Sequence, residues 1–140
     1  PNALSQHTDW ASTVSDIINQ EATVAITISD NGNQITVQAK ELSTISGNLK
    51  LVVCITEDGV IDKQIVDNIV VNDYQHDHVL RTHLNGTWGT DISLSNEYTS
   101  FDFSYTLDNS WQRSNCHAIA YIYNDSNKEV LQVEKIHLTN

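Results

Sequence analysis

Methionine is absent from this chain, proline occurs once and cysteine only twice in 140 residues. No run of about 18 apolar residues is present, so the sequence lacks the signal for a membrane-spanning helix. The first ten residues, PNALSQHTDW, also lack the basic start and apolar middle of a secretory signal. Because an initiator methionine is missing as well, we expect the chain to be a piece of a longer, processed protein.

Basic side chains are scarce too. Seven Lys and Arg residues stand against 18 Asp and Glu residues, which gives a formal net charge of -11. A charge of this sign repels phosphate backbones and anionic lipid surfaces over long distances. The composition therefore argues against nucleic acid as a partner.

The two cysteines are too few for a disulfide framework, although they could form one bridge in an oxidising compartment. In a strand over residues 49–57, Leu51 and Val53 would share one face and Cys54 would lie on the other. Cys116 instead alternates in phase with Ala118. We therefore predict two unpaired thiols that pack as small apolar groups.

The length and the 39% hydrophobic content suit one compact domain. Thr8 and Asp9 are good helix N-cap residues, and four apolar residues recur at helical spacing up to about residue 20: Trp10, Val14, Ile17 and Ile18. We predict a short helix over 9–20, in an N-terminal segment (1–20) that enters a β-domain covering 21–140.

From residue 22 onward the apolar period changes to two, which is typical of strands with one buried face. Residues 22–29 and 34–41, joined by Asp30-Asn31-Gly32-Asn33, predict a hairpin. Further strands are predicted at 49–57, at 60–66 with an uncertain partner, in the segment 90–107, at 115–124 and at 129–138. The pattern predicts an all-β fold, an antiparallel β-sandwich of seven to eight strands, immunoglobulin-like or jelly-roll-like. Residues 67–90 are expected to form a long, irregular, polar connection, and such loops often carry function.

Within this connection, Tyr74, His76, His78 and Arg81 lie close together in sequence. An HxH pair on a strand places two imidazoles on one face, so a metal site with Asp77 or His83 is one hypothesis, although zinc needs three or four ligands. The favoured interpretation is structural: one histidine donates to a backbone carbonyl and Arg81 pairs with a carboxylate. No metal and no cofactor is assigned.

The sequence shows no catalytic constellation. No serine stands in GxSxG, and no DxDxDG calcium loop occurs. Cys116 and His117 are adjacent, but neighbours on a strand point to opposite faces, which disfavours a nucleophile and base pair. Trp88 and Trp111 could be exposed rings for sugar or protein contact, but burial as plugs at the ends of the sandwich is the favoured interpretation.

Four segments together carry a resemblance to a known family: LKLVVCITED (49–58), HDHVLR (76–81), NGTWG (85–89) and EVLQV (129–133). In order and spacing they resemble the C-terminal domain of the outer-membrane lipoproteins named after a twenty-eight-kilodalton outer-membrane protein of Gram-negative bacteria. The resemblance implies attachment to the outer membrane through a lipid on an N-terminal cysteine outside these residues. It also implies a thioredoxin-like domain before this one in many relatives, and a surface adhesin or receptor role without a known ligand.

Two function classes follow. The favoured hypothesis is a non-enzymatic module of a cell-surface lipoprotein that binds a protein or glycan or has a structural role, with Tyr74, His76, His78, Arg81 and Trp88 as candidate binding residues. The alternative is a metal-binding or redox-linked accessory domain that uses the loop from His76 to His83.

Overall fold

The computed structural model describes residues 9–138, which form one α-helix, α1 (Trp10–Ile18), ten strands and a 3-10 turn, η2 (Arg113–Asn115). The strands are β1 (Val24–Asp30), β2 (Gln34–Glu41), β3 (Leu49–Glu57), β4 (Val60–Val66), β5 (Ile69–His76), β6 (Val79–His83), β7 (Thr90–Ile92), β8 (Thr99–Ser104), β9 (Cys116–Asn124) and β10 (Val130–His137). None of the helices in this part of the chain is long and apolar enough to cross a membrane.

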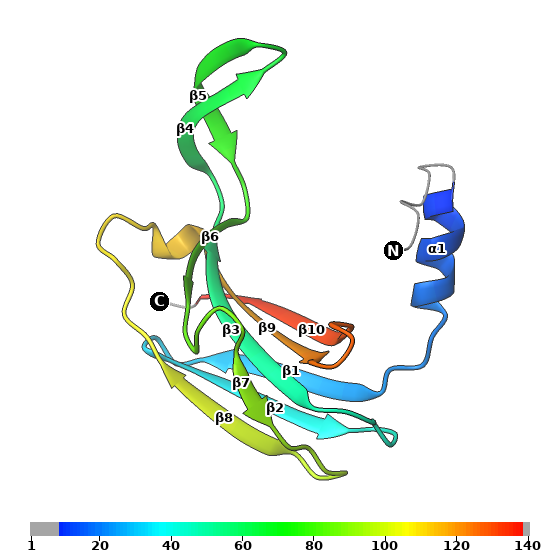
Figure 1. The fold of residues 1–140 in the computed structure, drawn as a ribbon. Helices are drawn as coiled ribbons and strands as arrows, with labels where there is room; N and C mark the ends of the chain where they lie inside the picture. Colours follow the sequence, from blue (N-terminus) through cyan, green and yellow to red (C-terminus); the bar gives the residue numbers. More distant parts are fainter. Residues whose placement is uncertain (1–8, 139–140) are drawn as a thin grey trace.

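The strands form two sheets that face each other and a separate ribbon (Figure 1). One sheet has the order β1-β2-β8, and the other has the order β10-β9-β3-β6, with β7 also paired to β3. All pairings are antiparallel. The predicted antiparallel sandwich is therefore confirmed, with ten strands in place of seven to eight.

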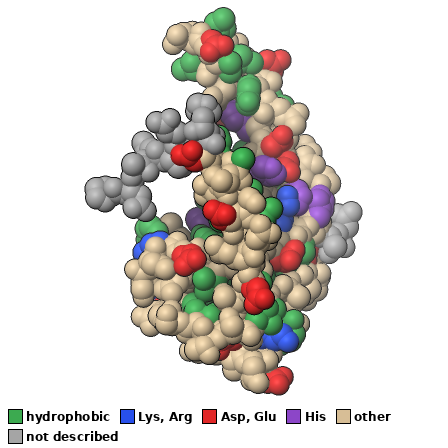
Figure 2. Space-filling model, turned by 90° about the vertical axis from the view of Figure 1, so that its right-hand side faces the viewer, with side chains coloured by type: hydrophobic (Ala, Val, Ile, Leu, Met, Phe, Trp, Pro, Cys, Tyr) green, Lys and Arg blue, Asp and Glu red, His purple; other side chains and the backbone are tan. Residues whose placement is uncertain are grey.

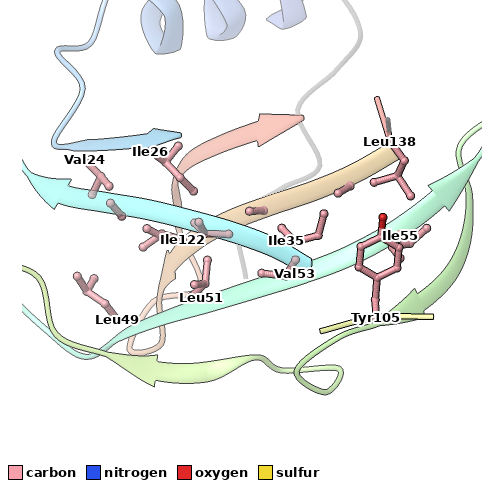
Figure 3. Close-up of a cluster of buried hydrophobic side chains, with 14 of the residues drawn as sticks. Val24, Ile26, Ile35, Leu49, Leu51, Val53, Ile55, Tyr105, Ile122 and Leu138 are labelled. Atoms are coloured by element: carbon pink, nitrogen blue, oxygen red, sulfur yellow. The ribbon is translucent and has the colours of Figure 1, made fainter. Parts of the chain in front are cut away.

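Alternating side chains of β1, β2, β3 and β9 fill the space between the sheets (Figure 3). On β3, the inward residues Leu51, Val53 and Ile55 are fully buried, as the period of two predicts. Cys116 belongs to this core, whereas Cys54 is buried on the opposite face of β3, and both thiols are unpaired. The predicted strand phases of the two cysteines are correct.

One end of the core is closed by a polar group. The hydroxyl of Tyr105 donates to Asp30 Oδ1 at 2.8 Å, and Arg113 Nη2 donates to the Tyr105 oxygen at 2.6 Å and to the Gly32 carbonyl at 2.9 Å. Burial, together with the hydrogen bond to Asp30, raises the pKa of Tyr105 to about 12. This group joins the β1–β2 turn to the segment that leads into β9.

The helix α1 matches the predicted position but is not packed against the sandwich. The Asp9 side chain makes no capping hydrogen bond, and the other predicted cap, Thr8, lies outside the described residues. The four apolar residues that defined the helical period remain more than half exposed: Trp10, Val14, Ile17 and Ile18. Helical spacing thus predicted the element correctly, although no core covers its apolar face.

The prediction of a long irregular connection over 67–90 is wrong. Most of it is β-structure, because β5 pairs with β4 and β6 pairs with β3. Asp67 and Asn68 both have positive φ, 50° and 64°, and they separate the paired residues Val66 and Ile69. This geometry is a two-residue hairpin turn of type I′, which matches the natural twist of paired strands. The ribbon β4–β5 projects away from the sandwich at the top of Figure 1, and we call residues 60–76 the arm.

Candidate functional site: a projecting arm and an exposed tryptophan

The structure separates the five candidate residues into two places. Tyr74 and His76 lie on β5 in the arm, and His78 and Arg81 lie at or just beyond its base. Trp88 lies in the loop before β7, which pairs with the first residues of β3, whereas the arm leaves from the last residue of β3. The two groups therefore lie at opposite ends of β3 and do not form a single site.

Four residues, Asp58, Gly59, Asp77 and His78, form the neck through which the arm joins the sandwich. The β3–β6 ladder ends at the pair of Glu57 and Val79, and the arm's ladder begins at Val60 and His76. Between them Asp58 Oδ1 accepts the backbone N–H of His78 at 2.6 Å, and Asp77 Oδ1 accepts that of Gly59 at 2.8 Å. Gly59 and His78 have φ values of 72° and 59°. Two residues with a left-handed backbone conformation thus turn the ribbon out of the sheet, and the backbone N–H of each is bound by a carboxylate from the neighbouring segment of the neck.

This neck explains why His76 and His78 do not form a metal pair. The HxH argument required a continuous strand, but the left-handed backbone at His78 breaks the alternation. The His76 ring lies edge-on to Tyr74 at 4.9 Å, and His78 Nδ1 lies 3.0 Å from Asp58 Oδ1. Among residues 9–138 no group of three or more His, Cys, Asp or Glu side chains is placed to hold a metal ion. The sequence predicted that a histidine of this segment donates to a backbone carbonyl. In the structure, His78 instead contacts the carboxylate of Asp58.

Two further histidines, His117 and His137, lie beside the neck, and neither was among the predicted site residues. His117 on β9 has its Nδ1 3.7 Å from Asp58 Oδ2 without a hydrogen bond, and its ring meets that of His137 on β10 edge-on at 4.7 Å. Burial, followed by the positive charge of Lys135, lowers the pKa of His117. The backbone hydrogen bond from His78 lowers the pKa of Asp58. The pairing of β3 with β9 brings His117 near Asp58, and the pairing of β9 with β10 brings His137 to His117, so spacing in the sequence carried no signal for them.

Arg81 supports the body of the domain. Its Nε donates to Glu57 Oε2 at 2.7 Å, and the other oxygen of the buried Glu57 accepts the backbone N–H of Gln112 at 2.7 Å. The guanidinium also lies 5.8 Å from the ring centroid of Trp111, which packs against the core. The predicted carboxylate partner of Arg81 and the predicted burial of Trp111 are both confirmed.

The arm carries apolar side chains on both of its faces. Directly paired residues share a face, so Val66 and Ile69 lie on one side of the ribbon and Ile65 and Val70 on the other. Their exposed fractions run from 41% for Val66 to 67% for Ile65 and Ile69. Figure 2 shows hydrophobic side chains open to solvent on the arm at the top of the view. Within the described part of the chain, β4 and β5 pair only with each other, so both ribbon edges are open as well.

Trp88 is the clearest departure from the predicted burial. Its side chain is 71% exposed, so it is not a plug at the end of the sandwich. It borders a shallow hollow together with Tyr121, Tyr123, Lys128 and Val130, on the outer face of the five-stranded sheet. This hollow is the second candidate contact surface of the molecule.

The fold is that of an all-β domain with one short helix, and comparison with known proteins gives its family. Residues 2–140 match the family described as "Outer membrane protein Omp28", so the chain belongs to the Omp28 family of outer membrane proteins. This is not known as a family of enzymes. The resemblance found in the sequence is thereby confirmed. A comparison with curated proteins gives no significant match.

Two solved structures from Porphyromonas gingivalis share the fold. A domain of the outer membrane lipoprotein Omp28 is 20% identical, with a TM-score of 0.56, and the match covers 86% of this chain and 91% of that one. HBP35 is 14% identical, with a TM-score of 0.69, and the match covers 91% of this chain and 45% of HBP35. At these identities the likeness concerns the fold alone, and this chain corresponds to less than half of HBP35.

Proposed function

We propose that this domain is a non-enzymatic binding module of a lipid-anchored outer membrane protein, of adhesin or receptor type, and that its arm binds a protein partner. The observation that carries the proposal is the ribbon with exposed apolar side chains on both faces. A two-stranded ribbon is marginally stable by itself, and exposed apolar patches on soluble domains mark contact sites. Tyr74 and His76 belong to the contacting element, while His78 and Arg81 hold its base.

A protein suits the arm better than a membrane surface does. The arm contains Asp62, Asp67 and Asp73 but only one basic residue, Lys63, and the whole chain carries a net charge of -11. Anionic lipid headgroups would therefore repel it. The open edges of β4 and β5 offer backbone groups to which an extended segment of a partner can add as a further strand.

The test compares two matched pairs of substitutions in the full-length protein on Gram-negative cells. Ile65→Ser with Val70→Ser changes one face of the arm, and the control pair Leu42→Ser with Val133→Ser changes side chains of similar exposure outside the arm and outside the hollow beside Trp88. Attachment of the cells to host-cell monolayers is the readout, with surface amounts made equal. We expect the arm pair to lower attachment by about tenfold or more, as the loss of central apolar anchors does, and the control pair to leave it unchanged. Equal effects of the two pairs, or no effect of the arm pair, would reject the proposal.

A further inference from the structure

The segment Asn85–Gly89 contains Trp88. The side chain of its first residue, Asn85, bonds to the backbone of β3 as a neighbouring strand would. Asn85 Oδ1 accepts the backbone N–H of Val53 at 2.9 Å, and Asn85 Nδ2 donates to the Leu51 carbonyl at 2.7 Å. These are the two backbone groups of β3 that a neighbouring strand would otherwise satisfy. The side chain therefore attaches the loop to β3 in the interval between the end of β6 and the start of β7.

The two glycines of the segment fix the shape of the loop. Gly86 and Gly89 have φ values of 82° and 71°, and the Gly89 N–H donates to the Gly86 carbonyl at 3.1 Å. A Cβ atom at Gly89 would lie 2.2 Å from the Leu51 carbonyl oxygen, so the loop lies directly against β3. The Tyr123 hydroxyl also donates to the Trp88 carbonyl at 2.8 Å. The Trp88 backbone is thus anchored from both sides although its indole remains exposed.

The hollow beside the indole has a volume of about 370 Å³, within the range of roughly 300–1,000 Å³ that is common for small-ligand sites. Its lining is mainly apolar, and the rings of Tyr121 and Tyr123 lie 6.2 Å apart and tilted by 39°. Lys128 lies over the Tyr123 ring at 5.7 Å and is paired with Asp125. The surface therefore consists of aromatic faces and one ammonium group whose charge is already matched.

From this arrangement we infer that the hollow binds a neutral sugar ring of an oligosaccharide, stacked on Trp88. The faces of aromatic rings are electronegative, and the C–H bonds on one face of a pyranose are weakly positive at hydrogen, so the two surfaces attract. Thr87 and Tyr121 also line the hollow, and both are residues whose hydroxyl groups can exchange hydrogen bonds with a sugar.

Charge selects against ionic ligands in this hollow. A cationic ligand would meet Lys128, which already occupies the face of Tyr123. An anionic ligand would have to approach a chain of net charge -11, and the nearest ammonium group is held by Asp125. Because the backbone of Trp88 is already held in place, less conformational entropy is lost when a ligand binds, which matters for a weak ligand such as a single sugar.

The test uses four neutral disaccharides as probes: maltose, cellobiose, lactose and N,N′-diacetylchitobiose. Binding is measured by saturation-transfer NMR and calorimetry on the wild-type domain, on Trp88→Ala and on Trp10→Ala, which removes a tryptophan of similar exposure from α1. We expect at least one probe to bind with a dissociation constant in the range of about 1 mM. We expect Trp88→Ala to weaken that binding by about tenfold or more and Trp10→Ala to leave it unchanged.

Three results would overturn the inference: no saturable binding of any probe at about 10 mM, unchanged affinity in Trp88→Ala, or equal binding of the anionic monosaccharide N-acetylneuraminic acid. The Trp88 indole is exposed, so its removal leaves the fold intact, and Tyr121→Ser serves as a second variant of the same hollow. The hollow shares no residue with the arm, so its test and the test of the proposed function fail independently.

Discussion

At the scale of single residues, a buried ion pair is expected to contribute more to stability than an exposed one. Glu57 is 4% exposed and has both oxygens engaged, one by Arg81 and one by the backbone of Gln112. A buried carboxylate that loses its counter-charge must bear the full cost of desolvation. Arg81 is therefore expected to matter for stability and not for ligand contact.

We predict that Arg81→Ala lowers the free energy of unfolding by about 3 kcal/mol, because it leaves Glu57 buried without its cation. Urea unfolding monitored by circular dichroism measures the loss. Lys50→Ala is the matched control, because Lys50 is paired at 3.0 Å with Asp91, whose side chain is 80% exposed. That pair is screened by water, so its loss should be much smaller. Equal losses in the two variants would contradict the structural role of Arg81.

The glycines around Trp88 provide a second pair of matched substitutions. Both Gly86 and Gly89 have positive φ, so an alanine at either position strains the backbone by a similar amount. Only Gly89 lies against β3, whereas a Cβ atom at Gly86 meets nothing within 4 Å. We predict that Gly89→Ala costs about 2 kcal/mol more than Gly86→Ala, which is the usual range for forced contacts in packed sites. Thermal unfolding of both variants checks this, and a difference near zero would mean that the loop is not clamped.

At the scale of elements, the sequence predicted the strands whose two faces meet different surroundings. Along β1, β2 and most of β9, buried residues alternate with more exposed ones, so the period of two was visible. One strand of the arm, VIDKQIV, was predicted without its partner, whereas IVVNDYQH was assigned to an irregular connection. Apolar residues of this ribbon face solvent on both sides, which leaves no contrast between two faces along IVVNDYQH. Its one local signal was Asp67-Asn68 between two apolar runs, a pair of residues suited to a type I′ turn.

The neck responds to pH through His117, which faces Asp58 and His78 at the base of the arm and His137 and Lys135 on β10. Its folded pKa lies below the ordinary value of 6.5. Between these two values the unfolded chain binds more protons, so stability is full above about pH 6.5 and falls as the pH drops through the window below it. The lowered pKa of Asp58 adds a further loss that begins only below its usual value of 3.8.

We therefore predict that the melting temperature of the wild-type domain falls as the pH drops below about 6.5, and that His117→Gln flattens this part of the profile. Thermal unfolding in buffers of equal ionic strength gives the profile. An identical slope in His117→Gln would show that protonation of this residue does not limit folding.

At the scale of the whole molecule, the sandwich places the arm and the hollow beside Trp88 at opposite ends of β3. The sequence placed the five candidate residues in one loop because they are neighbours in the chain. The structure assigns Tyr74 and His76 to the arm, His78 and Arg81 to its support, and Trp88 to a separate hollow. This division depends on where β3 pairs with β6, β7 and β9, which is a long-range property that local spacing does not encode.

Photo-crosslinking in intact cells tests most directly whether the arm binds a protein partner. A photoreactive amino acid is placed at position 65 in the arm or at position 133 on β10 of the full-length protein, two exposed apolar positions on different elements. If the arm binds a protein partner, we expect a discrete protein adduct at position 65, which is lost when Val70 is changed to serine, and no adduct at position 133. Adducts of equal yield at both positions, or none at position 65, would contradict it.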